Sequence, residues 1–203
     1  MHRSTLAEDR LAAARAISAL YIARRTTRVP VVELAAAADI SERTFHRYFS
    51  SKSDTVQPLF EENSRIVNAV VAADPASSLR RALTEAHEQM FGGVNAASTA
   101  ALFPVLFTDR GMWSGFLGAL HDGEQRLHPV LASRLGLAND APRALAASSA
   151  FTAANRIALE RMADGGANRL GTFNAVLDAF GAELFEPDNS PPPEPAVRAA
   201  SGA

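Results

Sequence analysis

Histidine and carboxylate side chains gather in one stretch where they could support metal chemistry. His121, Asp122, Glu124 and His128 occur close together in the sequence. In an ideal helix, however, the spacing of His121 and His128 separates them by about 10.5 Å along the axis, too far for two ligands of one metal ion. The chain also has no cysteine, no glycine-rich phosphate loop and no nucleophile elbow. We therefore expect no catalytic residue, no metal ligand and no cofactor.

A second set of side chains is basic and could contact nucleic acid. Arg43 and Arg47 are spaced i, i+4, which puts both guanidinium groups on one helix face, within reach of guanine edges or phosphates. Lys52 comes just before a further expected helix, whose first amides could hold a phosphate together with its ammonium group. The pattern predicts a DNA-binding surface made of Arg28, Ser41, Arg43, Thr44, His46, Arg47, Tyr48 and Lys52.

These side chains need a scaffold, and the surrounding pattern predicts a helix-turn-helix. Residues 31–38 and 42–49 are expected to form two short helices joined by a turn, with Ser41 capping the second helix. Leu34, Phe45 and Phe49 can form a small shared core that fixes the angle between them. The outward face of the second helix then stays free to enter the major groove of DNA.

The sequence around this turn resembles the TetR family of repressors. The run from Thr44 to Asp54, TFHRYFSSKSD, is similar to the family pattern Thr-Leu-Tyr-x-Tyr-Phe-x-x-Lys at the end of its recognition helix. The LA at 34–35 and the ADIS at 38–41 match the family's Ile-Ala and Ala-Gly-Val-Ser positions. The resemblance covers roughly residues 11–59. It implies a homodimer, paired through its last two helices, that binds a near-palindromic DNA operator.

One departure from the family pattern affects a predicted DNA contact. Relatives open their second helix with Thr-Thr, and one of these threonines usually caps the helix and contacts a phosphate. This chain has Val29 and Pro30 there. We expect Arg28 or Thr27 to take over this phosphate contact.

The middle of the chain is unusually aromatic. Such a set of residues either fills a solid core or lines a cavity with a few polar anchors, and the residues alone leave both interpretations open. Resemblance to the family favours a pocket for a small-molecule effector. The loops at 106–137 and 163–166 are similar to those of a mycofactocin-associated subset, which implies an apolar, acyl-bearing effector. The predicted lining residues are His87, Phe91, Phe103, Phe107, Trp113, Phe116, Leu120, His121, Phe151 and Asn155.

The periodicity of apolar residues predicts an all-α chain of about nine helices. Alanine is abundant and no run alternates with a period of two residues. We expect a helix-turn-helix domain at residues 1–53, a helical ligand-binding and dimerisation domain at 54–186, and a disordered proline-rich tail at 187–203. The expected helices span residues 6–24, 31–38, 42–49, 54–73, 77–91, 98–107, 113–135, 141–163 and 170–185, and Pro104 is expected to kink or end its helix early.

Charge and hydropathy agree with this division. Through Pro58 the chain has nine basic and six acidic residues, whereas the remainder has eleven basic and sixteen acidic ones. No uncharged apolar run approaches the roughly 18 residues of a membrane span, and the N-terminus lacks a signal-peptide pattern, so we expect a cytoplasmic protein without a membrane partner. An alternative hypothesis is a helical interaction protein whose DNA-binding domain has degenerated.

Overall fold

The computed structural model describes residues 5–187, which fold into nine α-helices and three short 3-10 segments without any strand. The predicted all-α class is therefore confirmed. The α-helices are α1 (Leu6–Arg24), α2 (Val31–Ala37), α3 (Glu42–Tyr48), α4 (Gln57–Ala73), α5 (Leu79–Phe91), α6 (Ala96–Phe107), α7 (Arg110–Leu135), α8 (Pro142–Gly165) and α9 (Arg169–Ala179). The 3-10 segments are η1 (Ser53–Val56), η2 (Gly93–Asn95) and η3 (Ala182–Phe185).

The first three helices pack around large aromatic side chains. Tyr21 of α1, Phe45 of α3 and Phe49 at the end of α3 are each at most 1% exposed and belong to one apolar core. The turn between α2 and α3 places Asp39 at a φ of 53°, a left-handed conformation that aspartate tolerates better than most residues. Ser41 then caps α3 by accepting the amide of Thr44 at 3.1 Å. This part of the chain is a helix-turn-helix.

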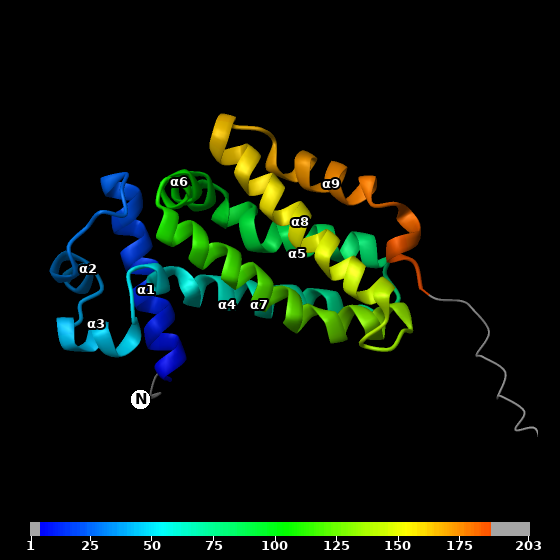
Figure 1. The fold of residues 1–203 in the computed structure, drawn as a ribbon, viewed down its shortest axis with the longest axis horizontal. Helices are drawn as coiled ribbons and strands as arrows, with labels where there is room; N and C mark the ends of the chain where they lie inside the picture. The colour runs from blue at the N-terminus through cyan, green and yellow to red at the C-terminus, as the bar shows by residue number, and fades with distance from the viewer. Residues whose placement is uncertain (1–4, 188–203) are drawn as a thin grey trace, which may run out of the picture.

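The remaining helices form a larger unit beside the first (Figure 1). α4 and α7 pack along each other, α5 packs on α4, and α8 packs on both α7 and α9. α8 and α9 lie together along one side of the unit. Its core includes the fully buried side chains of Leu83, Leu131 and Phe173.

The two units share a packed junction. The core around Tyr21 and Phe45 continues into Leu106 of α6 and Met112 of α7. The hydroxyl groups of Tyr21 and Thr55 lie 3.3 Å apart. The predicted domain boundary after residue 53 therefore falls where the helix-turn-helix packs against the body.

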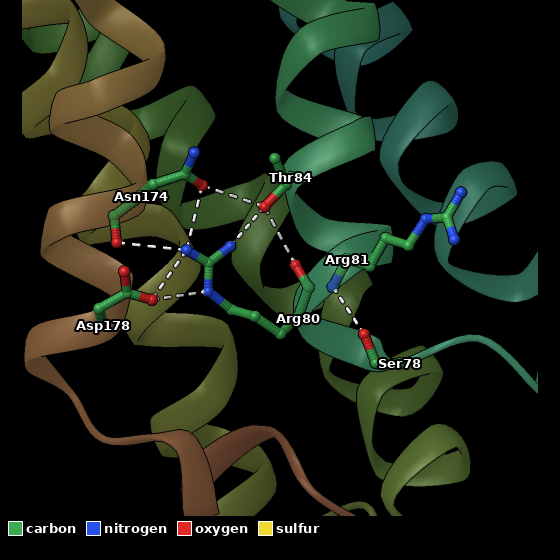
Figure 2. A network of polar contacts seen from close by, with 6 residues as sticks. All are labelled: Ser78, Arg80, Arg81, Thr84, Asn174 and Asp178. Carbon is green, nitrogen blue, oxygen red and sulfur yellow. Dashed lines mark hydrogen bonds and ion pairs between the residues drawn. The ribbon is translucent and has the colours of Figure 1, made fainter.

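A network of polar contacts fastens α9 to α5 (Figure 2). The guanidinium of Arg80 on α5 donates to the Asp178 carboxylate at 2.9 Å and to the side-chain oxygen of Asn174 at 3.1 Å. It also donates to the hydroxyl of Thr84, one turn along α5. The side chain of the neighbouring Arg81 points away from this network. Its backbone amide donates to the hydroxyl of Ser78.

Several helix ends differ from those expected. The expected fourth helix at 54–73 begins as the 3-10 segment η1, and α4 starts at Gln57. The expected last helix at 170–185 is divided into α9 and η3 at Gly181, whose φ is 90°. Most of the predicted tail, residues 188–203, lies outside the described residues.

We expected Pro104 to kink its helix or to end it early. The early end was wrong, because α6 continues to Phe107. Proline leaves the carbonyl of the residue four positions earlier without a helical donor. That residue is Ala100, which is exposed to solvent. Phe103 and Leu106 are buried on either side of Pro104, so packing maintains the helix through it.

Within the described residues, no single helix has both the length and the apolarity needed to cross a membrane. Two segments have the required length and apolarity only when they are taken together, and the chain bends sharply between them. These segments are Leu79–Phe91 and Gly93–Phe107.

Candidate DNA-binding surface and ligand cavity

The predicted DNA-binding residues on α3 lie on its outward side. Phe45 and Phe49 anchor the helix in the core, whereas Arg43, His46 and Arg47 are exposed. No ion pair involves either arginine among residues 5–187. Both guanidinium groups are therefore available to phosphates or base edges.

The other α3 side chains of the predicted surface are already engaged within the protein. The hydroxyls of Ser41 and Thr44 lie 3.0 Å apart, and Ser41 also caps the helix. Tyr48 is half-buried, with the guanidinium carbon of Arg47 located 5.2 Å from its ring centroid. This cation–π contact supports the orientation of Arg47 along the helix surface.

Arg28 and Lys52 are also exposed. The neighbouring groups that were expected to bind phosphate with them are already hydrogen-bonded within the protein. Thr27, the expected alternative to Arg28 as a phosphate contact, is only 4% exposed and donates its hydroxyl to Asp109 at 2.8 Å. Arg28 is then the remaining candidate. Near Lys52, the amide of Thr55 bonds to the Lys52 carbonyl within the first turn of η1. The exposed ammonium group of Lys52 is available to bind a phosphate, whereas the Thr55 amide already donates to the Lys52 carbonyl.

A small, partly open cavity of about 60 Å³ lies in the larger unit, among α4, α5, α7 and α8. Five of the ten predicted lining residues border it: Phe91, Phe116, Leu120, Phe151 and Asn155. Phe103 borders a second space of about 180 Å³ that also reaches Leu11 and Arg15 of α1. The two spaces share Phe60, Asn63, Met90 and Phe91 in their linings.

The other four predicted lining residues lie elsewhere. His121 is exposed on the outer side of α7. Phe107 and Trp113 stack edge to face, 4.8 Å between ring centroids, and pack against the main core without bordering the cavity. His87 is fully buried beside the cavity residue Asn155.

His87 is held in one protonation state by its surroundings. Its Nδ1 lies 2.7 Å from Oδ1 of Asn155, and because a carboxamide oxygen only accepts, Nδ1 carries the proton. Its ring stacks on Phe173 at a centroid distance of 4.0 Å. Burial, with a smaller contribution from the charge of Arg169, lowers the pKa of His87 to about 3. The imidazole is therefore neutral and orients the Asn155 amide at the cavity wall.

Comparison with known proteins depends on structure, since no model of a protein family and no curated protein matches the sequence. Two solved structures are similar over most of the chain. One is a Mesorhizobium loti MAFF303099 protein named as a candidate TetR-family transcriptional regulator, with a TM-score of 0.56, 15% identity, and coverage of 88% of this chain and 97% of that one. The other is a TetR-family transcriptional regulator from Streptomyces coelicolor, with a TM-score of 0.58, 17% identity, and coverage of 87% and 80%.

The chain has the TetR-family fold. In this TetR-like chain, α3 is the second helix of the helix-turn-helix, and the cavity lies in the larger unit that α4 joins to it. The resemblance to the mycofactocin-associated subset stays a prediction.

Sequence reasoning missed the whole α4 side of the cavity in this TetR-like chain. Phe60, Ser64 and Val67 border the cavity at i, i+4 and i+7 spacing, the pattern of one inward helix face. That spacing was a usable signal. Glu124 also borders the cavity, although sequence reasoning treated it only as part of a rejected metal site.

Proposed function

We propose that this chain is a ligand-responsive transcriptional regulator. In this proposal it acts as a repressor that binds a near-palindromic operator as a homodimer, in the cytoplasm, and is released by a small apolar effector. The observation that carries the proposal is the outward face of α3, where Arg43 and Arg47 are exposed and unpaired within residues 5–187, on a helix anchored by buried Phe45 and Phe49. The TetR-family fold supports it.

The proposed homodimer uses the outer sides of α8 and α9. Phe180, at the end of α9, is 46% exposed and Leu145 of α8 is 38% exposed. Thr172, Ala175, Val176, Ala179 and Phe180 line an open, largely apolar groove on α9. Exposed apolar side chains on adjacent helices favour association with a second copy. A two-fold dimer would present two α3 helices to two operator half-sites.

The proposed signal passes from the cavity to the helix-turn-helix through α4 and α7. α4 borders the cavity with Phe60 and Ser64. Just ahead of α4, Thr55 contacts Tyr21 of α1. Asp109 caps α7 and also accepts the hydroxyl of Thr27 from the loop before α2. A ligand that moves α4 or α7 would therefore shift the populations of two spacings of the α3 helices.

DNA selection tests the regulator proposal. Duplexes that the full chain retains from a random library should converge on a near-palindrome, and affinity for that duplex should fall steeply as salt increases, because bound phosphates release counterions. Failure to retain any duplex at low salt would contradict the proposal and favour the helical interaction protein instead.

The direction of the effector's action is tested on the selected duplex. A compound that raises the thermal stability of the protein should lower the fraction of DNA bound in a mobility-shift series. An effector that strengthens the complex would reverse the proposed sign and make the protein a ligand-dependent binder.

A further inference from the structure

The cavity combines an aromatic wall with a single charge. Four phenylalanines border it: Phe60, Phe91, Phe116 and Phe151. Among the bordering residues within 5–187, Glu124 of α7 is the only aspartate, glutamate, arginine or lysine. A lipid-like anion would find no cationic partner there.

The carboxylate of Glu124 is largely shielded from water but not neutralised by an arginine or lysine. Its side chain is 19% exposed. One oxygen accepts the hydroxyl of Ser149 from α8 at 2.5 Å. Nε2 of His128 lies 3.8 Å away, which is beyond hydrogen-bonding distance but close enough for an ion pair when the imidazole is protonated. Within the described part of the chain, no arginine or lysine forms an ion pair with it.

The aromatic rings and the carboxylate favour the same kind of guest. The face of a phenylalanine ring carries the negative part of its quadrupole and attracts a cation, more strongly when the cation is shielded from water. A carboxylate at the edge of a low-dielectric space attracts a cation and repels an anion. Both effects act against a ligand with an acidic group and in favour of one with an ammonium group.

We propose that the cavity binds an organic cation, an ammonium group on an apolar body, with Glu124 as its counter-ion. This inference rests on the proposed ligand site and specifies its chemistry. The apolar body lies against Leu120, Leu127 and the phenylalanine rings. Asn63 and Thr152 at the cavity wall supply neutral polar contacts.

Three compounds of similar size separate charge from shape. Isothermal titration calorimetry of the full chain uses benzyltrimethylammonium, its uncharged carbon isostere neopentylbenzene, and the anion 3-phenylpropionate. We expect the ammonium compound to bind about tenfold more tightly than the carbon isostere, and the anion to bind most weakly. In Glu124→Gln, which keeps an acceptor for Ser149, the preference for the ammonium compound should fall to the smaller part that the phenylalanine rings contribute. Asp122→Asn, an exposed change on the same helix, should keep the preference.

Each remaining result overturns the cation assignment. These results are equal affinities for the ammonium and carbon compounds in the original chain, absence of binding by the ammonium compound, and a preference that is undiminished in Glu124→Gln. If that variant fails to fold, the comparison of the three compounds on the original chain decides alone. Duplex binding by the ligand-free protein is measured in the same preparations, and its loss would contradict the regulator proposal while leaving the cation preference intact.

Discussion

The neutral state of His87, which donates a hydrogen bond to the cavity residue Asn155, contributes to the stability of the protein. The imidazole is fully buried, donates to Asn155 and stacks on Phe173. Its pKa of about 3 lies below the 6.5 of an unperturbed histidine. Because the unfolded chain takes up this proton more readily than the folded one, the histidine's contribution to stability is complete above pH 6.5. That contribution is lost as the pH falls from 6.5 toward 3.

We therefore expect acid to destabilise the protein partly through this side chain. Between pH 7 and pH 5 the free energy of unfolding should fall by about 2 kcal/mol more in the original chain than in His87→Gln, which has no titrating ring. Urea unfolding followed by circular dichroism at both pH values measures the difference. Parallel losses in the two proteins would show that His87 takes up its proton equally in the folded and unfolded states.

At the scale of residues, spacing predicted the exposed face of α3 better than the lining of the cavity. Two arginines at i, i+4 must share a side of any helix, so Arg43 and Arg47 could be placed from the sequence. Cavity residues come from helices far apart in the chain, and their selection depends on how those helices pack. Composition therefore grouped Trp113 and Phe107 with Phe116, although only Phe116 borders the cavity.

At the scale of helices, Arg80 provides one of the polar attachments of α9 to α5. Its guanidinium joins Asp178 and Asn174 to α5, and both it and Asn174 also contact Thr84. The exposed pair with Asp178 contributes little alone, whereas the partly buried hydrogen bonds to Asn174 and Thr84 contribute more.

Arg80→Ala should lower the free energy of unfolding by about 1–3 kcal/mol, because it removes the hydrogen bonds that the guanidinium donates to Asn174, Thr84 and Asp178. Arg81→Ala is the matched control, since that side chain points away from the network, and it should change stability by less than about 0.5 kcal/mol. Chemical denaturation compares the two. Equal effects would contradict a specific role for the Arg80 network.

Helix positions were predictable from periodicity, whereas some helix ends were not. Gly136, at the end of α7, has a φ of 70° and stops the helix where the sequence predicted. Proline was a misleading signal at Pro104, because packing on both sides outweighed one lost hydrogen bond. The change from η1 to α4 coincides with Pro58 in the first turn of α4, a local signal for the start of a helix.

At the scale of the whole molecule, the proposed binding to two operator half-sites requires two copies of the chain. Phe180→Glu places a charge in the proposed interface and should convert the dimer into a monomer, because burying an unpaired carboxylate is costly. Size-exclusion chromatography with light scattering reports the mass. Val94→Glu is the control, since Val94 is an apolar residue 99% exposed in the loop between α5 and α6. A Phe180→Glu protein that stays dimeric would contradict the proposed interface.

The outward face of α3 is proposed to enter a DNA groove, and fluorescence anisotropy with the selected duplex measures this contact. Arg47→Ala should weaken binding to that duplex by about 5- to 150-fold, equivalent to roughly 1–3 kcal/mol, and should weaken binding to a scrambled duplex less. Arg161→Ala, an exposed arginine on α8, should bind both duplexes as the original chain does. If Arg47→Ala and Arg43→Ala each bound the selected duplex as tightly as the original chain, α3 would not be the DNA-binding surface.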